Sequence, residues 1–273
     1  MTTTHDRDYV LGTHAEEIER LGLQHRVWRP KALDAWRRAG FTIGQQIMDV
    51  GCGPGFASLD LAELVGSTGR VIAVDRSRRF LDALEAARRA RGLTNIEIHE
   101  LDLDEAELPR IGADGAWGRW VFSFVKNPRG LLAGIARTLK RGGVLVLHEY
   151  FDYSTWRLAP RVPEIEDFVR EVMASWREHG GEPDIALALP RWMGELGFEL
   201  RSVSAIVDVV PPSSFVWHWP SSFVRVGLER LVELGRLTTD QATAITRALA
   251  EAEAAPDTLM ITPAVLEMVA VLR

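Results

Sequence analysis

The sequence feature that most constrains this fold is a glycine-rich turn at residues 49–55, Asp-Val-Gly-Cys-Gly-Pro-Gly. A short apolar run at residues 47–50 leads into the turn, and a helix-forming run at 56–65 follows it. Glycine has no Cβ and adopts left-handed backbone conformations at little cost, so such a turn can pass close to a ligand. A strand, a glycine turn and a helix in this order predict the opening unit of an α/β sheet.

The same alternation continues for the next hundred residues. Apolar runs at 47–50, 71–74, 96–101, 121–125 and 144–147 read as buried strands. The intervening segments 56–65, 80–91 and 128–139 are long and periodic enough for crossover helices, and Asn127 with Pro128 forms a typical helix start. Strands that alternate with helices predict a doubly wound sheet that is covered on both faces.

Residues 1–40 predict an N-terminal helical cap made of two segments. The first opens with Thr13 and Glu16, whose spacing fits a capping box, and the second starts at Pro30 and ends at Gly40.

Beyond residue 151 the alternation is interrupted. Helices are expected at 162–179 and 185–196, a strand at 198–210, an inserted segment at 213–255 whose last helix starts at a Thr238 capping pattern, and a closing strand at 264–272.

Bulk composition narrows the class of protein. The chain has 273 residues, of which 47% are hydrophobic, so it should fold around a hydrophobic core. Its net charge of -6 argues against a protein whose function is to bind nucleic acid over a broad basic surface. Its start is polar and no apolar run is long enough to span a bilayer, which predicts no membrane partner. The single cysteine, Cys52, excludes an internal disulfide and a multi-cysteine metal site. The expectation is a cytoplasmic protein with no bound metal.

Phe56 bears on which cofactor the glycine turn holds. A dinucleotide-binding turn that starts at Gly51 would have Gly or Ala at position 56, where this chain has a large ring that would obstruct a pyrophosphate. An NAD(P)-dependent oxidoreductase is therefore disfavoured, although it stays an alternative.

With these motifs in order, the stretch from Asp49 to Gly55 resembles the first motif of the class I S-adenosylmethionine (SAM)-dependent methyltransferases, of the small-molecule type. The resemblance continues with Asp75 after the second strand, where the family's acid binds the ribose hydroxyls. It continues with Asp102 and Leu103 after the third strand, where the family binds adenine.

Three further segments resemble this family. Residues 118–121 are similar to the segment that contacts the methionine end of SAM, residues 139–143 are similar to the family's turn before the fifth strand, and the helix around Gln24 is similar to its N-terminal cap. The resemblance implies SAM as cofactor and these cofactor-binding residues: Gln24, Asp49, Gly51, Gly53, Gly55, Asp75, Arg76, Asp102, Leu103, Arg119 and Trp120.

The resemblance also implies the architecture. We expect a Rossmann-like α/β methyltransferase fold with a doubly wound, seven-stranded, mostly parallel sheet whose final strand is antiparallel. The expected division is an N-terminal helical cap at 1–40 and a SAM-binding methyltransferase domain at 41–273, with helical lid insertions at about 152–197 and 211–256.

The expected reaction is methyl transfer to an O, N or C nucleophile of a small, partly apolar molecule. His148, near the end of the fifth strand, is the candidate general base, with a packed structural histidine as the other interpretation. The expected substrate-binding residues are aromatic: Tyr150, Tyr153, Trp156, Trp217 and Trp219. A protein that binds SAM without catalysis stays an alternative, and the oligomeric state is open, with a homodimer as one option.

Overall fold

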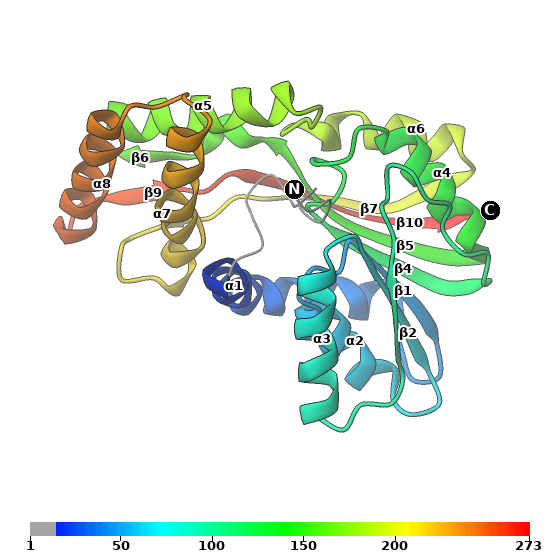
Figure 1. Cartoon of the computed structure of the whole chain (residues 1–273). Coiled ribbons are helices and arrows are strands. Elements are labelled where there is room, and N and C mark those ends of the chain that lie inside the picture. Colours follow the sequence, from blue (N-terminus) through cyan, green and yellow to red (C-terminus); the bar gives the residue numbers. More distant parts are fainter. Residues whose placement is uncertain (1–14) are drawn as a thin grey trace, which may run out of the picture.

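The computed structural model describes residues 15–273, which form a seven-stranded sheet with helices on both faces (Figure 1). The strands lie in the order β3-β2-β1-β4-β5-β10-β7. Strand β10 is antiparallel to both β5 and β7, while the first five strands pair in parallel. The predicted doubly wound, mostly parallel sheet with a final antiparallel strand is therefore confirmed. Its strands are β1 (Gln46–Val50), β2 (Arg70–Asp75), β3 (Ile96–Glu100), β4 (Ala113–Arg119), β5 (Leu139–Asp152), β7 (Phe198–Ile206) and β10 (Ala264–Leu272).

Successive residues of each strand point to opposite faces, and the helices divide accordingly. Ile47 and Trp117 pack in one apolar cluster with α1, α2 and α3, whereas Met48 and Leu145 pack on the other face with α4 and α6. These helices are α1 (Ala15–Ala39), α2 (Phe56–Val65), α3 (Arg78–Ala90), α4 (Pro128–Thr138) and α6 (Leu189–Glu195). The helix start predicted at Asn127 is confirmed, since its side chain accepts a hydrogen bond from the backbone N–H of Gly130.

A single helix, α1, replaces the two N-terminal segments that the sequence predicted. It runs through Pro30 without a break, although an interior proline removes one backbone hydrogen bond and costs about 3 kcal/mol. Trp28 and Trp36, one on each side of Pro30, are almost fully buried. The predicted break was wrong because tertiary packing on both sides outweighs the local cost of the proline. The predicted cap at Thr13 lies outside the described residues.

The predicted fourth strand at 121–125 was also wrong, because β4 lies earlier, at Ala113–Arg119. Gly115 explains the position of the strand. A Cβ at this residue would lie 2.5 Å from Cε1 of Phe41, so a glycine is needed where the strand passes the end of α1. The valines and phenylalanines at 121–125 have a high strand propensity, but they form the turn that follows β4.

The insertions after β5 build a second layer at one end of the sheet (Figure 1). It contains α5 (Pro163–Glu178), α7 (His218–Glu233), α8 (Thr239–Ala254), and a small sheet of β6 (Arg157–Ala159), β9 (Leu259–Ile261) and β8 (Val209–Val210). Short 3-10 turns lie at Tyr153–Thr155, Ile185–Leu187 and Phe215–Trp217. The predicted helices 162–179 and 185–196 and the Thr238 capping box are present. The small sheet was not predicted. It contains β8, so the region 198–210 holds two strands in different sheets instead of the single expected strand.

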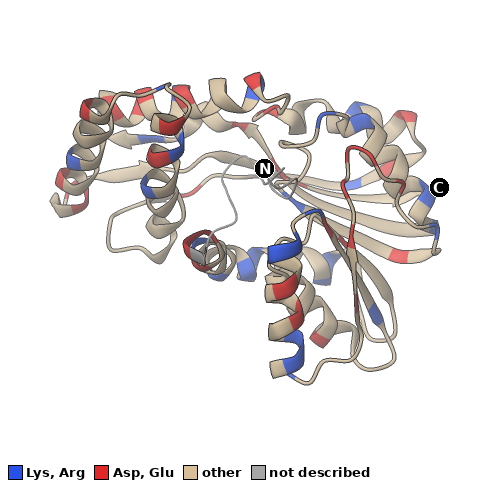
Figure 2. Ribbon diagram, in the orientation of Figure 1, with Lys and Arg blue, Asp and Glu red and all other residues tan. Residues whose placement is uncertain are grey.

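Acidic and basic side chains are interspersed along α3, α7 and α8 (Figure 2). Many form pairs one helical turn apart, such as Glu85 with Arg88, which fits solvated helix faces. Within residues 15–273, no helix is both long enough and apolar enough to cross a membrane.

Candidate functional site

A cavity of about 150 Å³ opens where β1, β2 and β4 end. The carboxyl ends of parallel strands at a change in strand order are the usual ligand site of open α/β sheets, and β1 lies at that change. The cavity is lined by all but one of the predicted cofactor-binding residues: Gln24, Asp49, Gly51, Gly53, Asp75, Arg76, Asp102, Leu103, Arg119 and Trp120. The structure therefore brings together side chains from five separate segments of the chain.

The three glycines of the turn have different local roles, although all three have positive φ angles. Gly51 packs against Val121, and a Cβ on Gly51 would lie 2.6 Å from this side chain. Gly53 lines the cavity, and a Cβ there would meet no described atom within 4 Å. Gly55 does not line the cavity; a Cβ there would lie 2.2 Å from Leu84 of α3. Only Gly53 is thus positioned to leave room for a ligand in the cavity.

Asp75 is held at the end of β2 by two backbone groups. Its Oδ2 accepts from the N–H of Gly53 at 2.9 Å, and its Oδ1 accepts from the N–H of Ser77 at 2.8 Å. Burial raises the pKa of this carboxyl, while the two N–H donors act in the opposite direction. A carboxylate oxygen has two lone pairs, so each oxygen can accept one further hydrogen bond from a ligand hydroxyl.

Asp102 lies at the cavity after β3, where its Oδ1 accepts from the backbone N–H of Asp104 at 3.0 Å. Asp104 in turn accepts from the backbone N–H of Lys126 at 2.7 Å. These contacts tie the loop after β3 to the loop after β4, with Leu103 between the two aspartates at the cavity wall.

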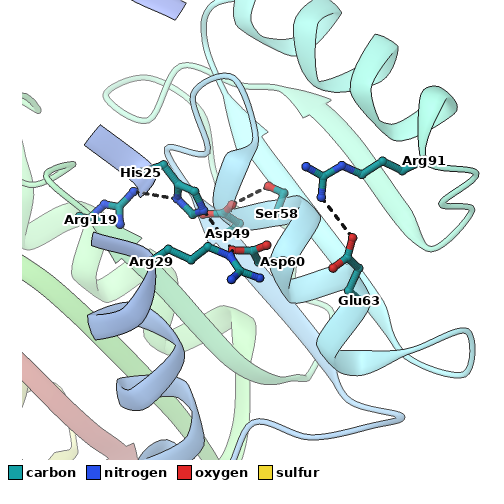
Figure 3. Close-up of polar contacts among 8 residues, drawn as sticks. All are labelled: His25, Arg29, Asp49, Ser58, Asp60, Glu63, Arg91 and Arg119. Atoms are coloured by element: carbon teal, nitrogen blue, oxygen red, sulfur yellow. Dashed lines mark hydrogen bonds and ion pairs between the residues drawn. The ribbon is translucent and has the colours of Figure 1, made fainter. Parts of the chain in front are cut away.

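Asp49 and Arg119 both line the cavity and interact electrostatically with each other (Figure 3). Asp49 accepts from the hydroxyl of Ser58 at 2.5 Å, and burial raises its pKa to about 7. Arg119 is part-buried, and desolvation lowers its pKa to about 10. Its Nη1 has no hydrogen-bond partner among the described residues. Because Arg119 lines the cavity, its guanidinium is the candidate partner there for an anionic ligand group.

Trp120 follows Arg119 and has a φ of 53°, which is unusual for a bulky residue. Its N–H donates to the carbonyl of His148, and the next two N–H groups donate to the carboxylate of Glu149. These bonds fix the turn in which Trp120 is exposed to the cavity.

Comparison with known proteins agrees with this geometry. Residues 48–147 match the family described as "Methyltransferase domain". The chain is 31% identical over 100 residues to aklanonic acid methyltransferase DauC of Streptomyces sp. (strain C5). The aligned region covers 37% of this chain and 46% of DauC. It is 26% identical over 191 residues to the ubiquinone/menaquinone biosynthesis C-methyltransferase UbiE of Erwinia tasmaniensis, covering 64% of this chain and 73% of UbiE. DauC and two further relatives are matched over less than half of their own length.

A solved structure shows the same fold over the whole chain. Phosphoethanolamine N-methyltransferase 2 of Haemonchus contortus, in complex with phosphomonomethylethanolamine and S-adenosylhomocysteine, superposes with a TM-score of 0.62 at 15% identity. The match covers 100% of this chain and 60% of the other. Residues 48–147 therefore match a methyltransferase domain, and the chain shares the fold of this N-methyltransferase. The domain match agrees with the predicted cofactor, SAM.

A second, narrower cavity of about 30 Å³ adjoins the first. Gln24, Trp120 and Phe124 line both cavities and so form a shared wall. We call the second cavity the aromatic chamber; its further lining is Arg20, Tyr150, Tyr153, Trp156, Trp176, Trp219, Pro220, Phe223 and Pro263. Trp120 stacks between Tyr150 and Trp219, with ring centroids 5.2 and 5.4 Å apart. The insertions after β5 thus supply most of an apolar wall.

Two residues that the sequence predicted near the methyl acceptor line neither cavity. His148 is fully buried in the sheet, where its Nε2 lies 2.9 Å from Oε2 of Glu267 on β10, and it lines neither cavity. This geometry favours the structural interpretation of His148. Trp217 is buried between α7 and α8, where its indole N–H donates to Glu253 at 3.0 Å. Tyr150, Tyr153, Trp156 and Trp219 do line the chamber.

Some lining residues were not predicted from the sequence. Arg20 donates to Glu17 at 2.6 and 2.7 Å and to Oε1 of Gln24 at 2.9 Å, so it fixes the glutamine that separates the two cavities. Trp176 of α5 reaches the chamber from an amphipathic helix, a pattern that also fits plain core packing. The buried pair of His25 and Asp60 was missed as well. The available signal was Asp60, an acidic residue between Leu59 and Leu61 in the mainly apolar segment 56–65.

Proposed function

We propose that this methyltransferase moves the methyl group of SAM to an O, N or C nucleophile of a small, at least partly apolar molecule that binds in the aromatic chamber. The observation that carries the proposal is the shared wall: Gln24, Trp120 and Phe124 line both the cofactor cavity and the chamber. The chamber, at about 30 Å³, would have to widen to admit an acceptor, whose reactive atom would then lie next to the cofactor cavity.

The residues of the first cavity fit SAM in chemistry as well as in position. Asp75 has free lone pairs that can accept hydrogen bonds from the ribose hydroxyls. Asp102 and Leu103 line the cavity and can bind the adenine ring. The guanidinium of Arg119, which lines the cavity, suits the carboxylate of the methionine end, and Asp49 can accept hydrogen bonds from its ammonium group. The open space above Gly53 leaves room for the backbone of the turn to contact the ligand.

When bound, SAM supplies a methyl group on a positively charged sulfur, which leaves as a neutral thioether. The protein therefore has to hold the acceptor in line and keep water out, which the apolar walls of the chamber suit. His148 has no place in this proposal, because it lines neither cavity.

We further propose that residues 1–40 cap the cofactor cavity and that the insertions at about 152–197 and 211–256 act as the lid over the acceptor. Leu21 and Gln24 of the cap line the cofactor cavity, and Trp176, Trp219 and Phe223 of the insertions line the chamber. We propose a cytoplasmic location, in keeping with its small-molecule acceptor. Sedimentation velocity would distinguish a monomer from the homodimer that the sequence leaves open.

The names of the relatives suggest where to look for the acceptor. DauC is named for aklanonic acid and UbiE for ubiquinone/menaquinone biosynthesis, so ring-containing acceptors should be tried first. The experiment is a screen of small metabolites with SAM, in which S-adenosylhomocysteine is measured with and without each candidate. The proposal predicts production that depends on an acceptor and is lost in Asp75→Ala. Tight SAM binding with no product across a broad panel would favour a non-catalytic SAM-binding protein instead.

A further inference from the structure

A buried chain of polar contacts links α2, α1 and β4 beside the cofactor cavity (Figure 3). Nε2 of His25 lies 3.0 Å from Oδ2 of Asp60, and Nδ1 of His25 lies 3.3 Å from Nη2 of Arg119. His25 and Asp60 are 6% and 7% exposed, so the chain is shielded from water. Neither residue lines the cofactor cavity, but Arg119 does.

The partners determine which nitrogen of His25 carries the proton. Arginine only donates hydrogen bonds, so Nδ1 of His25 must accept from Arg119. Nε2 then carries the hydrogen and donates to Asp60. Asp60 is fixed from its other side by Arg29, whose Nε donates to the same Oδ2 at 2.7 Å. The carboxylate of Asp60 thus selects the His25 tautomer that can accept from the guanidinium.

Phe56 holds the imidazole in place. Its ring stacks on that of His25 at a centroid distance of 5.8 Å and an interplanar angle of 23°. Phe56 is the first residue of α2 and also lines the cavity. The ring that disfavours a dinucleotide at this turn therefore has a second effect, which is to restrict the rotation of His25.

We infer that His25 is a positioning residue for the methyl donor: it holds Nη2 of Arg119 through its Nδ1 lone pair and so fixes the orientation of the guanidinium that lines the donor's cavity and would pair with the donor's carboxylate. This inference rests on the proposed function, because it needs SAM in the cofactor cavity. The two ends of the guanidinium have different environments, since Nη2 bonds to His25 and Nη1 has no partner among the described residues. Holding one end of a planar group fixes where the other end points.

The inference is tested by comparing SAM with decarboxylated SAM, which lacks only the carboxylate, by calorimetric titration of the full chain. The wild-type protein should bind SAM at least about tenfold more tightly than the decarboxylated compound, which is the discrimination expected of one charge-assisted pair in a shielded site. Arg119→Met should remove most of this discrimination.

The informative variants are His25→Phe and His25→Asn. Phenylalanine keeps the stacking on Phe56 but has no lone pair for Arg119, so the discrimination should fall several-fold while binding of decarboxylated SAM changes little. The oxygen of asparagine can take the place of Nδ1, so His25→Asn should restore much of the discrimination. A purely structural role of His25 would weaken the binding of both compounds equally.

A pH profile provides an independent readout. The charged groups that face His25 are Asp60 on α2, Arg29 on its own helix and Arg119 on β4, and Asp49 lies near Arg119. Protonation of Nδ1 would put an N–H against Arg119 and break the contact, so SAM affinity should fall as the pH drops from 7 to 5. Asp49 also titrates near this range, but it is present in both the wild type and His25→Asn. The difference between the two pH profiles of SAM affinity therefore reports on His25 alone.

The outcomes separate this inference from the proposed function. If SAM binds but His25→Phe discriminates as the wild type does, the inference is overturned and the proposed function stands. If Arg119→Met retains the discrimination, the carboxylate lies elsewhere and the inference is likewise overturned. If folded wild-type protein binds neither compound, both fail.

Discussion

The carboxylate of Glu149 on β5 accepts a hydrogen bond from the backbone N–H of Val121 at 2.7 Å. The same oxygen accepts from Phe122 at 3.0 Å, and Oε2 accepts from the hydroxyl of Ser123 at 3.1 Å. Glu149 is fully buried, and burial raises its pKa to about 7. One side chain therefore satisfies the donors of the turn that carries Trp120 to the boundary between the two cavities.

The first prediction concerns this carboxylate. Glu149→Ala should lower the free energy of unfolding by about 3 kcal/mol, because it leaves two buried backbone N–H groups without an acceptor and creates a cavity. Urea denaturation measures the change. Ser123→Ala is the control and should cost about 1 kcal/mol, since the backbone donors keep their partner. Equal losses in the two variants would contradict this role of Glu149.

The second prediction separates binding from stability within the glycine turn. Gly53→Ala should cost only about 1 kcal/mol of stability, for its left-handed backbone, but should weaken SAM binding strongly because the new methyl group enters the cavity. Gly55→Ala should cost about 3 kcal/mol, since its Cβ would overlap Leu84. Thermal unfolding and SAM titration of both variants check this. A reversed pattern would place the ligand away from Gly53.

The third prediction concerns two buried tryptophans. Trp156 lines the chamber and its indole N–H has no partner among the described residues, whereas that of Trp217 donates to Glu253. Trp156→Phe should raise the KM for the acceptor and leave the Kd for SAM unchanged. Trp217→Phe should lower stability by about 1 kcal/mol, through its lost hydrogen bond, without changing either constant. Steady-state kinetics with an acceptor from the screen measures both constants. A change in KM only in Trp217→Phe would refute the proposal that the acceptor binds in the chamber.

The fourth prediction follows from the pKa of Asp49, which burial raises from 3.8 to about 7. The folded state then binds a proton that the unfolded state has lost, so this contribution to stability is complete below pH 3.8 and declines as the pH rises through 7. Asp49→Asn cannot titrate. The stability of the variant relative to wild type should therefore increase between pH 5 and pH 8, as measured by urea denaturation at both values. A difference that does not change with pH would show that Asp49 is ionised throughout.

Patterns in the sequence predicted the sheet and most of its helices because these depend on local signals. The glycine turn, the Asn127 cap and the Thr238 capping box all act within a few residues, and the structure has the cap and the capping box as predicted. The errors at Pro30 and at 121–125 arose where distant packing decides the local conformation. Trp28 and Trp36 hold the helix through Pro30, and Phe41 requires Gly115 in β4.

The cofactor cavity was easier to predict than the chamber. Asp49, Asp75 and Asp102 lie at or just beyond the carboxyl ends of β1, β2 and β3, so the topology alone brings them to one edge. The chamber is built from insertions with no comparable order, and an aromatic residue there has the same pattern whether it lines a cavity, as Trp219 does, or packs in the core, as Trp217 does. His148 shows the same ambiguity: its place near the end of β5 suggested access, but β10 covers it and supplies Glu267 as its partner.

The most direct test of the account is a calorimetric titration of the folded chain with S-adenosylhomocysteine. The account predicts saturable binding at one site per chain, and at least about tenfold weaker binding by Asp75→Ala, which loses the acceptor for the ribose hydroxyls. Absence of binding by the folded wild-type protein, with SAM as well as with S-adenosylhomocysteine, would contradict the central claim that this cavity holds the methyl donor.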